Sequence, residues 1–236
     1  MNKPDFKWDG VNNDLVHLDE KGNRTVNREE FLKGETFIQD QYEHIYPVKE
    51  GDVVLDLGAS IGIFTWKIMD RAAKVYAIEP LIDLIPFLKG NTVGYNVTTI
   101  NAFLNSGENG EVLHTDNCIN NFEPKLVRSI NFKEFLKENH IEKIDYIKTD
   151  CEGGEYDLIS NENIGWIKNN VRNIVGEWHL STDEEKIEFR YFRDKFLPQF
   201  KNVEVYSVID QKNIKWDLYN EHFLEYYHQV IIHIEV

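Results

Sequence analysis

The loop Asp56–Gly62 limits most strongly what this chain can fold into. It follows the short apolar run Val53–Leu57 and precedes apolar residues at helical spacing. A strand, a tight glycine turn and a helix form the first unit of an open α/β sheet, whose ligands bind at the carboxyl ends of the strands. Gly58 lets ligand atoms approach the backbone, and Gly62 lets the helix pack closely on its strand. We therefore expect a ligand site at this loop.

The later apolar runs are short, rich in Val and Ile, and separated by helical patterns, as buried parallel strands are. Five strands are expected at Val53–Leu57, Val75–Ile78, Thr98–Phe103, Ile144–Thr149 and Asn173–Glu177. Two further strands are expected at Val203–Ile209 and Gln229–Ile234. No clear apolar helix lies between them, which predicts that they pair antiparallel. This layout predicts an α/β, Rossmann-like methyltransferase fold: a mostly parallel seven-stranded sheet with an antiparallel final strand and helices on both faces.

The chain is expected to form one main domain, residues 36–236, preceded by a small cap, residues 1–35. Two short runs in the cap flank a turn, which predicts a hairpin. A helix is expected over Glu35–Tyr46 because apolar residues recur at helical spacing before Pro47. Further helices are expected after the cap residue Asn131 and over Thr182–Leu197.

The charge balance limits the partners of this chain. Its 26 basic and 41 acidic residues give a net charge of -15, which repels phosphate backbones and anionic lipids at long range. We expect no nucleic-acid partner and no membrane association. The chain has neither a long apolar run nor a signal-like N-terminus, so a cytoplasmic protein is expected. Cys118 and Cys151 form neither a metal-type nor a redox-type pair, and the oligomeric state stays open.

The cofactor loop favours S-adenosylmethionine over a dinucleotide. The pattern G-x-G-x-x-G cradles a pyrophosphate, and its middle glycine is missing here, with Ser60 near its place. Asp56 suits the ammonium of S-adenosylmethionine, directly or through water, and the backbone amides after Gly58 suit its carboxylate. Glu79 follows the next strand, where an acidic residue accepts from ribose hydroxyls. The expected cofactor contacts are Asp56, Gly58, Ala59, Ser60, Ile61, Gly62, Glu79, Pro80, Asn101 and Asp150.

A second motif, Lys148–Glu155, places several carboxylates where another strand ends. Glu177 and His179 end the following strand and should lie beside Asp150 if the two strands are neighbours. His179, Asp150 and Glu152 are the candidate catalytic bases, and the ordinary pKa of His179 suits that role best. With Glu177 they could instead hold a divalent cation, which is possible but not expected. In the plainest alternative, His179 makes a local hydrogen bond and the acids are solvated or cap a helix.

The two motifs together resemble the FkbM family of methyltransferases over about residues 35–180. Glu50–Gly62 is similar to the family's Val-Gly-Asp-Val-Val-Leu-Asp strand with its Gly-Ala-Asn-Ile-Gly loop, and Lys148–Glu155 to its Lys-x-Asp-x-Glu-Gly-x-Glu segment. Ser60 replaces a usual Asn, Gly154 a small side chain, and Asn131-Phe132 a frequent Leu-Asp. The resemblance implies methyl transfer from S-adenosylmethionine to oxygen, often of a sugar or small natural product. A saccharide-like small-molecule acceptor is therefore expected.

Two other functions stay open at this stage. One is a binding or scaffold protein that keeps the fold but has lost transfer activity, and the other is a nicotinamide-dependent oxidoreductase. The missing middle glycine disfavours the oxidoreductase. The aromatic-rich segment 216–227 either packs in the core or stacks on an acceptor ring.

Overall fold

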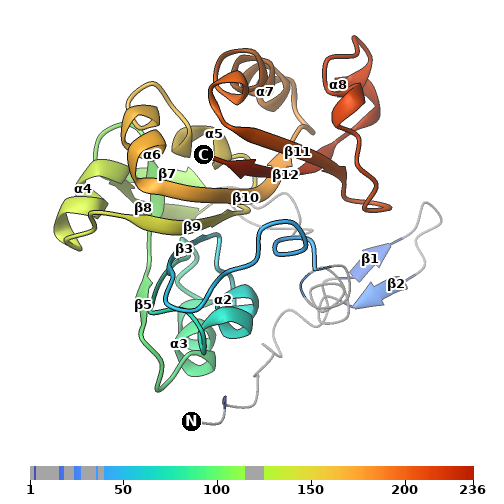
Figure 1. Cartoon of the computed structure of the whole chain (residues 1–236). Coiled ribbons are helices and arrows are strands. Elements are labelled where there is room, and N and C mark those ends of the chain that lie inside the picture. Colours follow the sequence, from blue (N-terminus) through green and yellow to red (C-terminus); the bar gives the residue numbers. More distant parts are fainter. Residues whose placement is uncertain (1–2, 4–15, 19–23, 28–35, 37–39, 115–124) are drawn as a thin grey trace.

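The structure, a computed structural model, describes residues 3, 16–18, 24–27, 36, 40–114 and 125–236. Its centre is a seven-stranded sheet in the order β11-β12-β10-β9-β3-β4-β5 (Figure 1). Strand β12 runs antiparallel to β10 and β11, and the pairs from β10 to β5 are parallel. The strands are β3 (Val53–Leu57), β4 (Lys74–Ile78), β5 (Val97–Ile100), β9 (Ile144–Thr149), β10 (Val171–His179), β11 (Asn202–Ser207) and β12 (Gln229–Glu235). The expected fold is confirmed, with β12 inserted between β10 and the edge strand β11.

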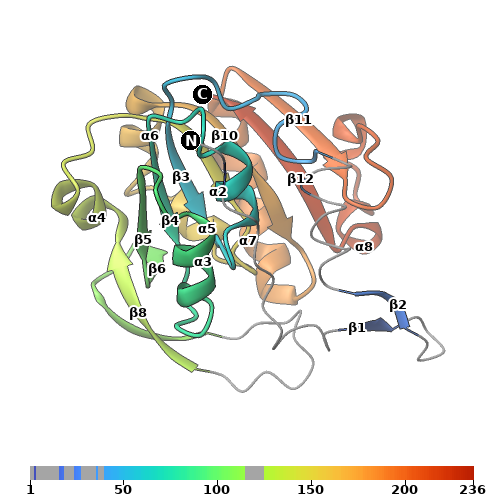
Figure 2. The same ribbon diagram turned by 90° about the horizontal axis from the view of Figure 1, so that it is seen from below.

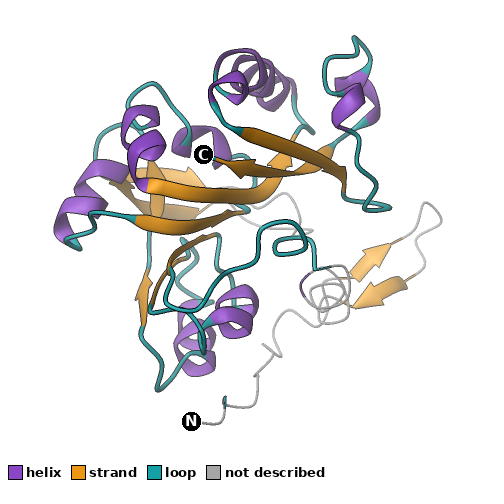
Figure 3. Ribbon diagram, viewed as in Figure 1, coloured by secondary structure: helices purple, strands orange, loops and turns teal. Residues whose placement is uncertain are grey.

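Helices cover both faces of the sheet (Figures 2 and 3). On one face lie α2 (Ile63–Ile68) and α3 (Ile85–Asn91), whose apolar residues pack on β3, β4 and β9. The other face carries α4 (Phe132–Glu138), α5 (Glu155–Leu158), α6 (Ile164–Asn170), α7 (Asp183–Lys195) and α8 (Phe223–Tyr226). Short 3-10 turns form at η2 (Leu197–Gln199) and η3 (Lys215–Asp217). Among the described residues, no helix combines the length and apolar character needed to cross a membrane.

The expected strand Thr98–Phe103 is divided in two. It forms β5 in the main sheet and β6 (Phe103–Asn105), which joins β7 (Gly110–His114) and β8 (Lys125–Asn131) in a separate three-stranded sheet. The break falls at Asn101, whose side chain donates to the carbonyl oxygens of Glu79 and Pro80. This side chain binds the end of the neighbouring strand, so the chain leaves the sheet there. The sequence did not predict β7 and β8.

The expected helix Glu35–Tyr46 is wrong for the described residues Asp40–Tyr46, which form turns. Asp40 has a φ of 52°, outside the right-handed helical region. Ion pairs from Asp40 and Glu43 to Lys67, and from Glu43 to Arg71, fasten the segment to α2 instead. Tertiary contacts therefore override the local helical pattern.

The other local predictions hold. β1 (Val16–Leu18) pairs antiparallel with β2 (Arg24–Asn27), the two runs that the sequence predicted to pair. The side chain of Asn131 caps α4 by accepting from the amides of Lys133 and Glu134. Thr182 caps α7 in a reciprocal capping box with Glu185, so α7 begins where the sequence predicted it.

Candidate active site

The loop after β3 is built from three residues with positive φ: Gly58 at 71°, Ser60 at 50° and Gly62 at 89°. A Cβ atom on Gly58 would lie 1.8 Å from the carbonyl oxygen of Asp150, and one on Gly62 would lie 2.6 Å from Cδ1 of Leu88. The two glycines are thus required by contacts within the protein. Gly58 lets the end of β3 lie against the end of β9, and Gly62 lets the loop pack against α3 rather than only against its own strand.

Glu79, directly after β4, links the loop that follows β3 to the turn that follows β4 through hydrogen bonds. Its Oε2 accepts from the amide of Ser60 and its Oε1 from the amide of Leu81, each at 2.8 Å. Asn101 donates to the carbonyl oxygens of Glu79 at 2.9 Å and Pro80 at 2.8 Å. These bonds fix the Glu79 carboxylate between the cofactor loop and the turn after β4. The structure thus brings these four expected contacts together, with Asn101 binding the backbone.

The first three amides of the loop are already hydrogen-bonded within the protein. The amides of Gly58 and Ala59 donate to the carbonyl oxygen of Ile78 at 3.1 and 3.0 Å, and that of Ser60 to Glu79. They are therefore not free to bind a ligand carboxylate. The Ser60 hydroxyl is buried and has no hydrogen-bond partner among the described residues. Because buried polar atoms are normally paired, this hydroxyl is the better candidate for a ligand contact.

Asp56 is fully buried and forms an ion pair with a buried lysine on the neighbouring strand. Its Oδ2 accepts from the Thr65 hydroxyl at 2.6 Å, and its Oδ1 lies 3.5 Å from Nζ of Lys148. Lys148 also donates to the carbonyl oxygen of Gly58 at 2.9 Å and lies 3.7 Å from Oδ2 of Asp150. The carboxylate of Asp56 thus has no exposed surface and pairs with Lys148, although its Oδ1 accepts no hydrogen bond from a described residue.

The pKa values in this pair respond to burial and to charge in opposite ways. Burial raises the pKa of Asp56 above its ordinary value, and Lys148 only partly offsets this. Burial acts to lower the pKa of Lys148, but the charges of Asp150 and Asp56 outweigh it and raise that pKa. Lys148 therefore stays charged at neutral pH, which keeps the two aspartates attached to it.

The second motif forms a cluster of acids around His179, as the neighbouring strands predicted. Gly176 of β10 pairs with Thr149 of β9, so the strands end side by side. His179 Nδ1 lies 3.2 Å from Glu155 Oε1, and Nε2 lies 3.4 Å from Glu152 Oε2 and 3.9 Å from Glu177 Oε1. The atoms that Asp150, Glu155 and His179 offer all lie within 4.8 Å of one another. The structure thus brings all three expected catalytic residues together.

Glu155 is the residue in this cluster for which the sequence pattern predicted no role. It is fully buried, and its carboxylate accepts from the amides of Cys151 at 2.6 Å and Gly153 at 3.0 Å as well as facing His179. Glu155 ends the motif quoted above, so the signal was present but could not be separated from a helix start. Cys151 is partly buried, and desolvation raises the pKa of its thiol above the ordinary range, which disfavours a nucleophile.

The acids also shift the pKa values of one another. Burial, and then the charge of Asp150, raise the pKa of Glu177 to about 8. Burial acts to lower the pKa of His179, but Glu155, Glu152 and Glu177 raise it well above its ordinary value. Both shifts favour the protonated forms of His179 and Glu177. The same spacing of oxygen and nitrogen atoms also suits the divalent cation that the sequence left possible.

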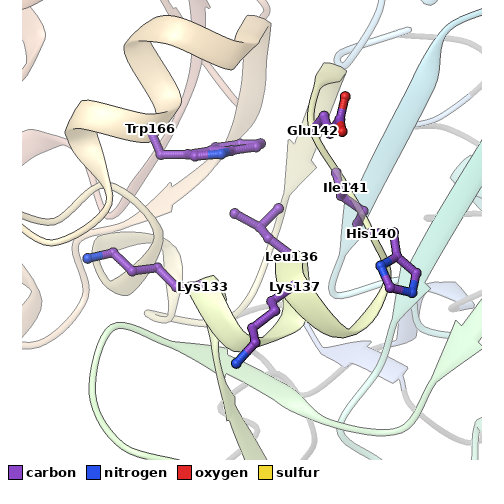
Figure 4. A pocket seen from close by; sticks show the side chains of 7 residues that line it. All are labelled: Lys133, Leu136, Lys137, His140, Ile141, Glu142 and Trp166. Carbon is purple, nitrogen blue, oxygen red and sulfur yellow. The ribbon is translucent and has the colours of Figure 1, made fainter.

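Two other features lie outside this cluster. A hollow of about 380 Å³ lies at the opposite edge of the sheet, beside the turn that precedes β9 (Figure 4). It is lined by Lys133, Leu136, Lys137, His140, Ile141, Glu142 and Trp166. In the aromatic-rich segment 216–227, Phe223 is buried, whereas Trp216, Tyr219 and Tyr226 are exposed. The segment therefore contributes to the core and also presents rings at the surface.

Comparison with known proteins gives one extensive match and several partial ones. A family model described as a methyltransferase FkbM domain matches residues 56–208, more than half of the chain. The ribosomal RNA small subunit methyltransferase A of Clostridium botulinum is 37% identical over 70 residues, which span 30% of this chain and only 25% of that protein.

Solved structures with a similar fold have low sequence identity. A precorrin-6y C5,15-methyltransferase from Geobacter metallireducens is 14% identical, with a TM-score of 0.47 over 95% of this chain and 96% of that one. An rRNA methylase from Streptococcus thermophilus is 12% identical, with a TM-score of 0.46 over 89% of this chain and 98% of that one.

Replacement of Gly58 tests how tightly the two strand ends are packed. We expect Gly58→Ala to lower the free energy of unfolding by more than about 2 kcal/mol, because the new methyl group meets the Asp150 carbonyl and φ is positive. Gly90→Ala in α3 is the control, since a Cβ there meets nothing within 4 Å. It should be neutral or slightly stabilising. Urea denaturation of both variants measures the difference, and equal stabilities would contradict this packing.

Proposed function

Because the chain belongs to the FkbM family of S-adenosylmethionine-dependent methyltransferases, we propose that it methylates a hydroxyl group of a small, saccharide-like acceptor. One observation carries this proposal. The cofactor loop with Glu79 and the acid cluster around His179 lie at the same edge of the sheet, where Gly58 contacts Asp150. A cofactor held by the loop would therefore present its reactive end to a histidine and several carboxylates.

The residues of the loop fit S-adenosylmethionine. Glu79 is positioned by two backbone amides at the end of β4, where an acidic side chain of a βαβ unit accepts from ribose hydroxyls. The unpaired Ser60 hydroxyl offers a donor to the carboxylate of the cofactor. When bound, this cofactor supplies an electrophilic methyl group on a sulfonium. The protein must hold the acceptor oxygen in line with that methyl group and remove one proton.

We assign the proton transfer to His179. With the cofactor bound, the acceptor hydroxyl would lose its proton to Nε2 of His179 as it takes up the methyl group that the cofactor supplies. Glu155, 3.2 Å from Nδ1, orients the ring and stabilises the imidazolium that results. Glu152 and Asp150 lie beside the ring as second candidates for the same proton. The surrounding acids favour the charged ring, so His179 serves as a base only above its raised pKa.

Affinity for the cofactor tests the role of Glu79. We expect calorimetry to show that the wild type binds S-adenosylmethionine and that Glu79→Ala weakens this binding at least about tenfold, because two ribose hydroxyls lose their acceptor. Glu138→Ala, an exposed acid at the end of α4, is the control and should bind as the wild type does. Equal affinities for all three proteins would contradict the assigned ribose contact.

Transfer of a labelled methyl group tests the reaction itself. We expect label from methyl-labelled S-adenosylmethionine to appear on a hydroxyl of at least one member of a panel of simple glycosides, with His179→Ala lowering the rate at least about a hundredfold. Mass spectrometry locates the methyl group on the product. Label found only on nitrogen, or only on added RNA, would contradict the saccharide assignment, and no label on any acceptor would favour a binding or scaffold protein.

The pH dependence of transfer tests the role of Glu155. The pKa of His179 is raised, so kcat/KM should rise with pH as His179 loses its proton. Glu155→Gln removes one negative charge beside the ring and should move this rise to lower pH. The amide of Cys151 donates to Oε1 of Glu155 and that of Gly153 to Oε2, so the single side-chain oxygen of Gln keeps one of these two bonds, and thermal melting checks that the fold is retained. A rise at unchanged pH would show that another group accepts the proton.

A further inference from the structure

We propose that Tyr42 is a positioning residue that orients Asp150 to receive the ammonium group of the cofactor. This inference rests on the proposed function and specifies one contact of that site. Tyr42 belongs to the segment Asp40–Val48, which precedes residues 56–208 of the family match. Its hydroxyl donates to Oδ2 of Asp150 at 2.9 Å. The N-terminal segment thus contributes directly to the edge of the sheet where the cofactor is expected.

The burial of Asp56 leaves the ammonium of the cofactor without the acceptor expected from the sequence. Asp56 is fully buried, with Thr65 and Lys148 beside its carboxylate. Asp150 is a better candidate because its backbone touches Gly58 and 29% of its side chain is exposed. An ammonium group in the loop therefore finds the carboxylate of Asp150 more accessible than that of Asp56.

The contact with Tyr42 gives the two carboxylate oxygens of Asp150 different surroundings. Oδ2 accepts from Tyr42 and lies 3.7 Å from Nζ of Lys148. No described residue donates a hydrogen bond to Oδ1, which leaves this oxygen for a ligand. A carboxylate held on one side loses less rotational freedom when it binds a ligand on the other side. Tyr42 therefore increases cofactor affinity without touching the cofactor.

Tyr42 is itself held firmly in place. Its side chain is buried, and its ring packs edge-on against Phe64 with ring centroids 5.7 Å apart. Nζ of Lys148 lies 5.3 Å from the centre of the same ring, and the Tyr146 hydroxyl donates to the Tyr42 backbone carbonyl. The ion pairs of Glu43 with Lys67 and Arg71 fix the next residue. These contacts make the hydroxyl of Tyr42 a rigid donor.

Calorimetry with two ligands tests this inference. Tyr42→Phe should weaken binding of S-adenosylmethionine about fivefold to tenfold, because the lost hydrogen bond went to a charged group. Binding of 5′-methylthioadenosine, which lacks the amino-acid end, should change less than about twofold. Tyr46→Phe is the matched control in the same segment, where the hydroxyl accepts from Asn202 instead, and it should bind both ligands as the wild type does.

A double-mutant cycle shows whether Tyr42 acts through Asp150. We expect Asp150→Ala to weaken S-adenosylmethionine binding, and Tyr42→Phe to add no further loss in that background. Additive losses, or equal weakening of both ligands by Tyr42→Phe, would overturn the positioning role. A wild type that binds neither ligand would instead contradict the proposed function, and thermal melting separates both outcomes from loss of the fold.

Discussion

The buried ammonium of Lys148 is the interaction on which the site depends. It lies between Asp56 at the end of β3 and Asp150 at the end of β9, and it donates to the carbonyl oxygen of Gly58. Removing one partner from a buried group of charges typically costs about 3–5 kcal/mol, because the remaining charges lose their compensation. Lys148 therefore couples the geometry of the cofactor loop to that of the candidate catalytic strand end.

A second group of charges surrounds His179, and its negative charge is not balanced by a lysine or arginine among the described residues of the cluster. Four carboxylates surround one imidazole, and Glu155 and Glu177 are almost completely buried. Such a site favours protons or other cations, which explains why the pKa values of His179 and Glu177 are raised. The two groups meet at Asp150. The carboxylate of Asp150 thus lies beside both the ammonium of Lys148 and the imidazole of His179. The ion pair that holds the strand ends together is therefore next to the candidate base.

The sequence predicted the sheet well because its central strands are short runs rich in Val, Ile and Leu that are buried in the structure. Val53–Leu57 and Ile144–Thr149 were placed to the residue for this reason. Prediction from the sequence failed where contacts between residues distant in the chain determine the local conformation. The side chain of Asn101 ends β5 early, and the ion pairs of Glu43 convert an expected helix into turns. Neither contact has a local signal in the sequence.

For the candidate site, too, the sequence predicted the positions of some residues and not the contacts of others. Glu79 and His179 stand at strand ends, so their positions followed from the topology. Asp56 also stands at a strand end, but its burial depends on Lys148 and Thr65, which no spacing reveals. Tyr42 lies 108 positions from Asp150 in the sequence and outside both motifs, so only the folded structure brings the two together.

A crystal structure with S-adenosylhomocysteine would locate both ends of the cofactor at once. We expect the ribose on Glu79, the ammonium on Oδ1 of Asp150, and the open face of the sulfur directed toward His179. A cofactor bound with its sulfur directed away from His179, or bound elsewhere than at the Asp56–Gly62 loop, would contradict this arrangement.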